Sequence, residues 1–231
     1  MQYHLQDNLP LHHIPIRKRH IHISLVCSSL IAQLSSGIVM ITFNAIILSL
    51  EGNTGVAAYG VIANISLVIV AVYTGIAQGV QPLISSFYGK GDRQQVRTLL
   101  KYSTITMLTV SCAAYLLIFI FAQPITSIFN SEKNMDLQRI AVIGLKLYFI
   151  STAFVGYNII LATLFTSIEN ALPAHILSIL RGLILIIPMA FLLSAIWGMT
   201  GVWLAYPITE FIVALLGFIV DKKQTEKINE T

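Results

Sequence analysis

The chain has 231 residues, of which 56% are hydrophobic and 10% charged, and its mean hydropathy is +0.79. A soluble domain carries roughly one quarter charged residues, so this composition excludes a water-soluble fold, and its hydrophobicity also excludes disorder. The formal net charge of +4 is too small to indicate nucleic-acid binding.

Six long segments carry almost no charged residues, and each is long enough to cross a bilayer core about 30 Å thick as a helix. Turn-forming residues follow the first segment at 51–53, a polar connector covers 130–139, and Pro124 closes the third segment. We therefore expect an all-α, polytopic membrane protein. Its predicted spans are about 24–50, 56–88, 99–121, 140–167, 173–196 and 201–220.

The distribution of Lys and Arg predicts the orientation of these spans. Ten of them fall in the two predicted tails, 1–22 and 221–231, in the connection after the second span, or in the first turn of the third span, whereas the opposite side has only Lys133 and Arg139. Cytoplasmic segments are enriched in Lys and Arg. The prediction is a multi-pass protein of the plasma membrane with both termini in the cytoplasm. Five histidines lie in the first tail, but their spacing matches no zinc signature, so no metal site is expected.

Four short motifs, in this order on a six-span frame, resemble the multidrug and toxic compound extrusion (MATE) family, and within it the bacterial multidrug branch. The resemblance covers about 23–220. The motifs are VAAYG at 56–60, GIAQGVQP at 75–82 followed by Tyr88-Gly89, LSILR at 177–181 with Pro188 behind it, and GVWLAYPI at 201–208 with Glu210.

Members of that family have twelve spans in two six-helix lobes, and this chain is similar to the second lobe. The resemblance implies half of an antiporter that exports cationic amphipathic drugs in exchange for H⁺ or Na⁺, with no bound cofactor. Its implied partners are the lipid bilayer, a first lobe or a second copy of the chain, and small cationic organic substrates, with no nucleic acid. Whether the chain is a truncated reading frame, a split-gene subunit or a self-pairing half stays open.

Two alternatives remain beside that reading. The first alternative is that the chain is a transport-inactive fragment or a regulatory half-subunit. The second is that it belongs to a flippase of the same superfamily, which moves lipid-linked substrates. The flippase is the weaker alternative, because such substrates favour more basic residues in the cleft. An enzyme is not expected, since the sequence contains no nucleophile–base set, metal cluster or phosphate-binding loop.

Polar side chains inside the predicted spans are the candidate substrate-binding residues. They either face a central cleft or bond neighbouring helices, and the sequence does not decide between these roles. The candidates are Gln33 and Asn44 in the first span, Gln78 in the second, and Tyr148 and Asn158 in the fourth.

Glu210 is the only acid deep within a predicted span, whereas the acids that some family members carry in their seventh and tenth helices have no counterpart in 24–50 or 140–167. At 1.5 Å per residue, Glu210 lies about 16 Å and Arg181 about 23 Å below the turn that joins their helices. Lys146, about 9–12 Å deep, competes for the same carboxylate. Glu210 is therefore predicted to form an ion pair that locks helices together or to act in cation coupling.

Glycines inside the spans are predicted to permit close helix packing rather than to act as hinges. They are Gly75, Gly79, Gly144 and Gly156.

Overall fold

The computed structural model describes the backbone of residues 16–168 and 170–230, and the side chains of 37–168, 170 and 172–222. The described elements are all helical, which confirms the predicted fold class. They are α1 (Ile16–Gly89), α2 (Arg93–Phe129), α3 (Met135–Tyr148), the 3₁₀ turn η1 (Phe149–Ser151), α4 (Thr152–Ser167), α5 (Ala171–Ile179), the π-helical turn η2 (Leu180–Ile184), α6 (Ile186–Trp197) and α7 (Met199–Glu230).

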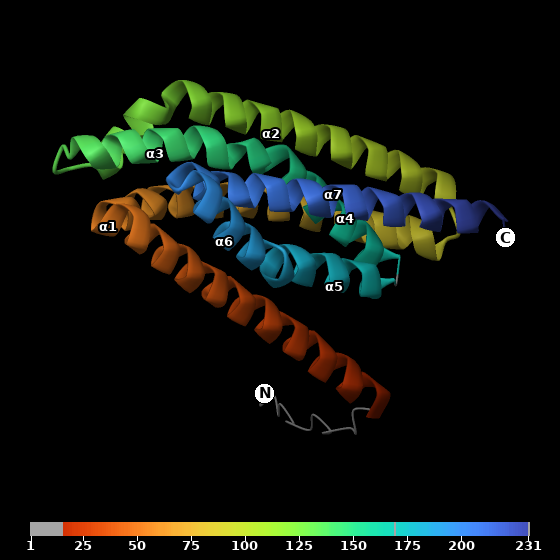
Figure 1. The fold of residues 1–231 in the computed structure, drawn as a ribbon. Coiled ribbons are helices and arrows are strands. Elements are labelled where there is room, and N and C mark those ends of the chain that lie inside the picture. Colours follow the sequence, from red (N-terminus) through yellow and green to blue (C-terminus); the bar gives the residue numbers. More distant parts are fainter. Residues whose placement is uncertain (1–15, 169, 231) are drawn as a thin grey trace, which may run out of the picture.

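Among the described residues, five helices are long and apolar enough to cross a membrane, where six were predicted. The difference arises in α1, which continues from the first predicted span into the second. Gly52 interrupts this helix with φ +62° and ψ −156°, a left-handed conformation that glycine adopts without strain. The chain reverses direction there, so α1 passes along the bundle twice (Figure 1).

Several helices extend past the predicted spans. α1 begins inside the predicted first tail and α7 ends inside the second, because hydropathy marks only the apolar part of a helix. Pro124 does not close the third span, since α2 continues to Phe129. A proline within a helix instead distorts the preceding turn, and the distortion is seen at Phe121, where φ is −98° and ψ is 16°.

The fifth predicted span is divided by the π-helical turn η2. In this turn, the Leu185 N–H donates to the Leu180 carbonyl at 2.9 Å, so one additional residue is inserted into the helix. Pro188 follows one turn later and cannot donate to the carbonyl of Ile184. The widened turn therefore lies where the proline removes a regular hydrogen bond.

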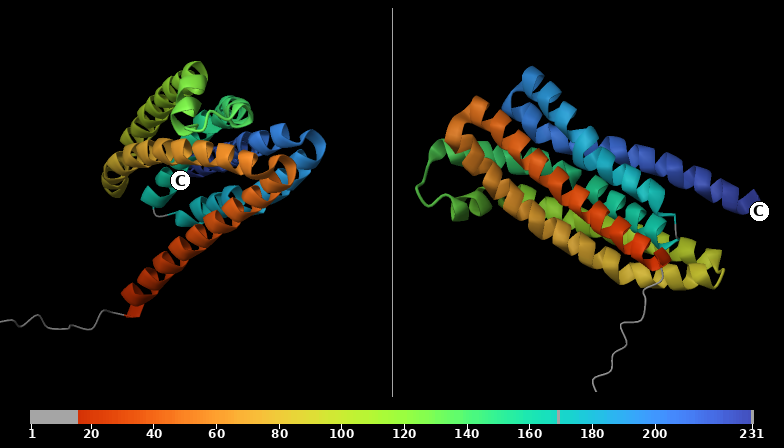
Figure 2. Two further views of the ribbon diagram at one scale, coloured as in Figure 1. Left: turned by 90° about the vertical axis from the view of Figure 1, so that its left-hand side faces the viewer. Right: turned by 90° about the horizontal axis from the view of Figure 1, so that it is seen from below.

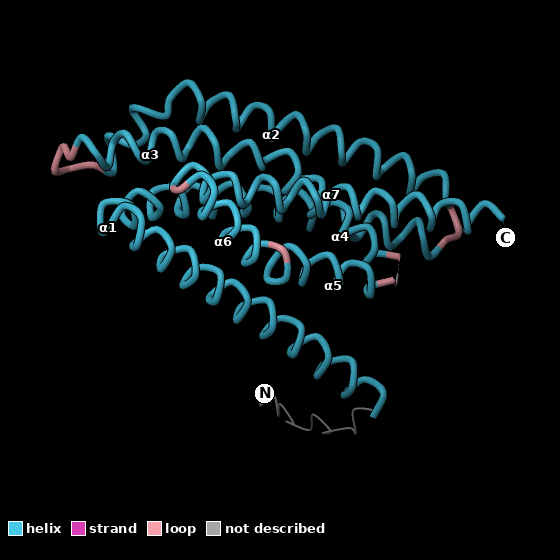
Figure 3. Tube along the Cα trace, viewed as in Figure 1, coloured by secondary structure: helices cyan, strands magenta, loops and turns pink. Residues whose placement is uncertain are grey.

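The first half of α1 runs diagonally away from the other helices, which follow a common long axis with most of the short connections at its two ends (Figures 1, 2 and 3). The start of α1, the α1–α2 turn, the α4–α5 connection and the end of α7 lie at one end, whereas the α2–α3 and α6–α7 connections lie at the other. The largest core cluster joins α1, α2, α3, η1, α6 and α7 around Trp203, Phe43 and Phe149. A second cluster includes Ile84, Phe165 and Val213.

Two of the four singled-out glycines lie at close helix contacts. A Cβ atom on Gly144 would come within 2.8 Å of the Trp203 ring, and one on Gly156 would come within 2.6 Å of Met107 Cγ. For Gly75 and Gly79 the same test finds no atom within 4 Å. The packing role predicted for this second pair is therefore wrong within the lobe, because both glycines lie on its exposed surface.

Candidate functional site

The most buried charged side chain of the described residues is that of Glu210 on α7, which is 1% exposed. Its Oε1 atom lies 3.4 Å from Nε of Arg181, whose side chain is 23% exposed. The two residues face each other because α6 and α7 form a hairpin that reverses at Gly198, where φ is +56°. Arg181 itself is carried by the π-helical turn η2.

Asn158 on α4 is the second partner of Glu210. Its Nδ2 atom donates to Glu210 Oε2 at 2.7 Å and to the Glu210 backbone carbonyl at 3.0 Å. One carboxylate oxygen thus forms an ion pair with Arg181 of η2, and the other accepts a hydrogen bond from Asn158 of α4. Asn158 Oδ1 and Thr209 Oγ1 are buried and have no hydrogen-bond partner among the described residues. We call Glu210, Arg181 and Asn158 the buried polar cluster.

Tyrosine side chains lie around this cluster. Tyr148 stacks on Tyr206 with ring centroids 4.7 Å apart and an interplanar angle of 3°. Both tyrosines lie close enough to Glu210 and Arg181 for these two charges to act on each phenol. Tyr206 was not among the candidates from the sequence, although it precedes Glu210 by one helical turn and therefore shares its face of α7.

Lys146, the other cation predicted to reach Glu210, has different neighbours. Its Nζ atom lies 4.8 Å from the centroid of the Phe119 ring, and its backbone carbonyl accepts from the Tyr115 hydroxyl at 3.2 Å. These contacts join α3 to α2. Lys146 was predicted to reach the carboxylate because the two residues have similar depths in the membrane. Depth does not determine which neighbouring helix a side chain faces, and Lys146 faces α2.

Of the remaining candidates, the two whose side chains are described, Asn44 and Gln78, form no hydrogen bond or ion pair with the buried polar cluster. Asn44 is half-buried and Gln78 is exposed. Gln33 lies on α1, outside the residues whose side chains the structure describes. Within the described part of the chain, no group of three or more His, Cys, Asp or Glu side chains could hold a metal ion. The clustered residues His4, His12 and His13 lie outside that part.

The MatE family model matches residues 28–192. The chain belongs to the MatE family. Its members are transporters rather than enzymes, and the apolar helices identify this chain as a multi-pass membrane protein.

Curated relatives of this MatE protein match it over part of their length. It is 25% identical over 193 residues to an FAD transporter of Shewanella oneidensis, covering 81% of this chain and 42% of the relative. It is 23% identical to the multidrug export protein MepA of Staphylococcus saprophyticus, covering 73% and 37%. The chain thus spans less than half the length of these two relatives.

Solved transporters of the same family share the fold of the chain. A MATE transporter of the MOP superfamily in an outward-facing conformation matches with a TM-score of 0.84 and 20% identity, covering 99% of this chain and 50% of the other. An inward-facing MATE transporter matches with a TM-score of 0.83 and 21% identity, covering 89% and 47%. The described helices therefore have the fold of one half of these transporters.

Proposed function

We propose that this chain is one lobe of a secondary antiporter in the plasma membrane. With a second six-helix lobe, it exports cationic amphipathic drugs in exchange for H⁺ or Na⁺. The second lobe is either a separate polypeptide or a second copy of this chain. The observation that carries the proposal is the similar match to an outward-facing and an inward-facing transporter, with TM-scores of 0.84 and 0.83.

A lobe that keeps its fold in both conformations is what alternating access by rigid-body rocking requires. The buried polar cluster supports such rigidity, because it connects α4, η2 and α7 through a single carboxylate. The geometry favours the role of Glu210 as an ion-pair partner that holds these helices together. A coupling role would need Glu210 to exchange Arg181 for a proton or a metal cation during transport.

The second half of α1 supplies a surface suited to a substrate cleft. Asn64, Gly75 and Gln78 lie on one side of this helix, and all are exposed. The same side of α1 also exposes Leu67 and Val68, at 69% and 65%, so it combines amides with apolar side chains. On α2, Leu116 and Leu117 are each 57% exposed, and no Asn or Gln occurs between 96 and 122. The Asn64 amide donates to the Gly60 carbonyl, but Gln78 forms no hydrogen bond with the described residues, and an amide that faces hydrocarbon without a hydrogen bond is costly. We infer that the α1 surface faces the second lobe and the cleft, and that α2 faces lipid.

Cytoplasmic termini are supported by the arrangement of the ends. The start of α1 and the end of α7 lie at the same end of the bundle as the basic α1–α2 turn (Figure 1). In a cysteine-free background, a cysteine at Asn134 is expected to react with an impermeant thiol reagent from outside intact cells, and one at Asp92 is not. The opposite pattern contradicts this topology.

Two other functions remain as proposals to test. The first is a transport-inactive or regulatory half, which would explain why 24–50 and 140–167 contain no Asp or Glu. A flavin dinucleotide, the substrate class named for the Shewanella oneidensis relative, is anionic and provides a second substrate class beside cationic drugs. A lipid-linked substrate would need more basic side chains in the cleft. In the described part of this lobe, Arg181 is engaged with Glu210.

Ethidium efflux from a drug-hypersensitive host tests the antiporter proposal. The chain is expressed alone and together with a separately encoded six-span lobe of the same family. If the second lobe is a separate polypeptide, gradient-dependent efflux is expected only when that lobe is co-expressed. Efflux from this chain alone that collapses with the H⁺ or Na⁺ gradient would show that two copies pair. Absence of efflux in both arms, with both chains inserted in the membrane, supports the inactive half and overturns the proposal.

A further inference from the structure

A second charged feature lies at the α1–α2 turn, on different elements from η2, α4 and α7, which carry the buried polar cluster. Lys90, Arg93, Arg97 and Lys101 are all exposed, and the last three follow one another at intervals of four residues on one side of α2. We call these four residues the basic stripe. Only one acid, Asp92, lies among them. The three residues on α2 extend over about 12 Å along the helix axis.

The local structure holds part of this stripe in place. Asp92 caps α2 by accepting from the Gln95 N–H at 3.0 Å, so its carboxylate is engaged with the helix backbone. The guanidinium carbon of Arg93 lies 3.9 Å from the centroid of the Tyr88 ring, and Lys90 Nζ lies 5.6 Å from that of Phe87. The aromatic rings at the end of α1 thus support one cation of the α1–α2 turn and one at the start of α2.

The same side of α2 continues as an apolar surface. Ile105, Leu108 and Leu116 follow the basic stripe at helical spacing, and they are 49%, 40% and 57% exposed. A cationic segment that leads directly into an exposed apolar one matches a molecule with an anionic head and long hydrocarbon chains. A soluble phosphate would use only the first part of this surface.

We propose that this side of α2 binds an anionic glycerophospholipid of the adjacent leaflet. The phosphate lies against the basic stripe and the acyl chains lie along the apolar residues that follow it. Juxtamembrane Lys and Arg clusters attract anionic lipids electrostatically, and here the helix also supplies the surface for the chains. The site is separate from the cleft, so the proposal does not depend on the transported substrate.

Lipid retention by the full chain, measured by native mass spectrometry from detergent, tests the proposal. The protein is exposed to equimolar phosphatidylglycerol and phosphatidylcholine. The variant R93Q/K101Q removes two charges from the basic stripe. The matched control K133Q/R139Q also removes one Lys and one Arg, but from the α2–α3 end of the bundle. Soluble glycerol phosphate is added in a separate arm as a competitor that has no acyl chains.

The unmodified chain is expected to retain phosphatidylglycerol preferentially. R93Q/K101Q is expected to lower that preference about 25-fold, since each Lys or Arg near a membrane surface contributes about a fivefold effect. K133Q/R139Q is expected to leave it unchanged, and glycerol phosphate is expected not to compete. Equal retention of the two lipids by the unmodified chain, an equal loss in both variants, or displacement by glycerol phosphate would each overturn the proposal.

Discussion

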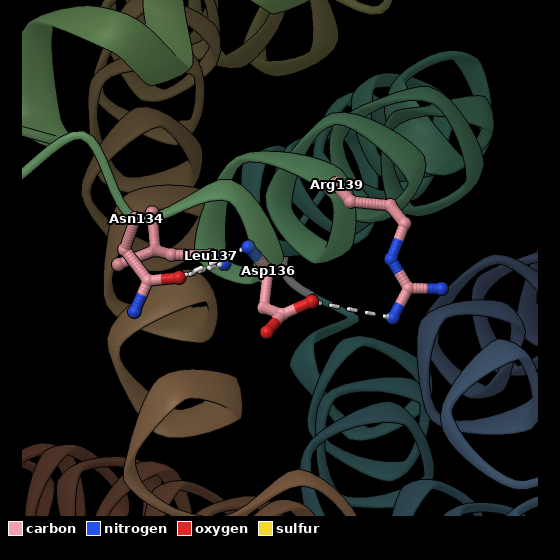
Figure 4. A network of polar contacts seen from close by, with 4 residues as sticks. All are labelled: Asn134, Asp136, Leu137 and Arg139. Carbon is pink, nitrogen blue, oxygen red and sulfur yellow. Dashed lines mark hydrogen bonds and ion pairs between the residues drawn. The ribbon is translucent and has the colours of Figure 1, made fainter.

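The described part of the chain contains two pairs of an arginine and a carboxylate in very different surroundings. Arg181 Nε and Glu210 Oε1 are 3.4 Å apart, and their side chains are 23% and 1% exposed. Arg139 Nη2 and Asp136 Oδ1 are 3.8 Å apart at the start of α3, with side chains 68% and 77% exposed (Figure 4). The first pair joins η2 to α7, whereas the second lies within one helix.

Burial decides what each pair contributes to stability. An exposed ion pair contributes about 0–1 kcal/mol, because water and salt solvate and screen both charges. A buried pair gains little over apolar side chains of the same size, but removing one partner leaves the other charge uncompensated. The buried pair is therefore expected to determine which helices stay together, while the exposed pair is expected to have little influence on the fold.

Breaking the buried pair should produce the largest effect. Arg181→Met or Glu210→Gln alone is expected to lower the free energy of unfolding by about 3 kcal/mol, the lower end of the range for buried pairs, since Arg181 is partly exposed. Thermal unfolding in detergent measures the loss. Lys146→Met is the control, because its cation–π contact with Phe119 is worth about 0.5–1 kcal/mol. An equal loss in Lys146→Met would show that the 181–210 pair has no special role.

Removing the amide donor should have the next largest effect. Asn158→Ala leaves Glu210 Oε2 without its 2.7 Å hydrogen bond and is expected to cost about 1–3 kcal/mol. Asn64→Ala is the matched control. Its amide is exposed and donates only to the Gly60 carbonyl on its own helix, so a smaller loss is expected. Equal unfolding midpoints for the two variants would contradict the role given to Asn158.

At the exposed end, the helix cap should matter more than the ion pair. Asn134 Oδ1 accepts from the backbone N–H groups of Asp136 and Leu137, at 2.9 and 3.2 Å (Figure 4). Asn134→Ala is therefore expected to cost about 1 kcal/mol. Asn134→Asp, which keeps the acceptor, should recover most of the loss. If Asn134→Asp unfolds at the same temperature as Asn134→Ala or at a lower one, the side-chain cap does not stabilise the helix.

The exposed pair should give the smallest effect. Arg139→Gln is expected to change the unfolding free energy by less than about 0.5 kcal/mol, and raising the salt concentration should abolish even that difference. The measurement is the unfolding midpoint at low and high salt. A salt-independent loss as large as that of Asn158→Ala would contradict the comparison between the two pairs.

Hydropathy and charge were sufficient to predict the all-α membrane fold, because burial in lipid imposes long apolar helices. The same signals could not predict that α2 continues beyond Pro124 or that η2 is π-helical, since both depend on how a local hydrogen-bond defect is relieved. The depth estimate placed both Arg181 and Lys146 within reach of Glu210. Only the rotation of each helix about its axis distinguishes them, and a single sequence does not specify that rotation.

Polar residues in the spans were predictable as candidates but not as a site. Asn158 binds Glu210, whereas Gln78 lies on the exposed surface of α1, although both are amides in apolar segments. Their different roles depend on which neighbouring helix lies opposite. Tyr206 could have been found from its position one turn before Glu210, because residues four apart share a helix face.

A double-mutant cycle on Arg181 and Glu210 tests most directly whether this pair locks the lobe. Unfolding free energies are measured for the unmodified chain, Arg181→Met, Glu210→Gln and the double variant. The double variant is expected to recover much of the single losses, giving a coupling of about 2–3 kcal/mol, because no unpaired buried charge remains. Glu210→Gln with Lys146→Met should recover less. A 181–210 coupling below about 0.5 kcal/mol, the size expected for an exposed pair, would contradict the account.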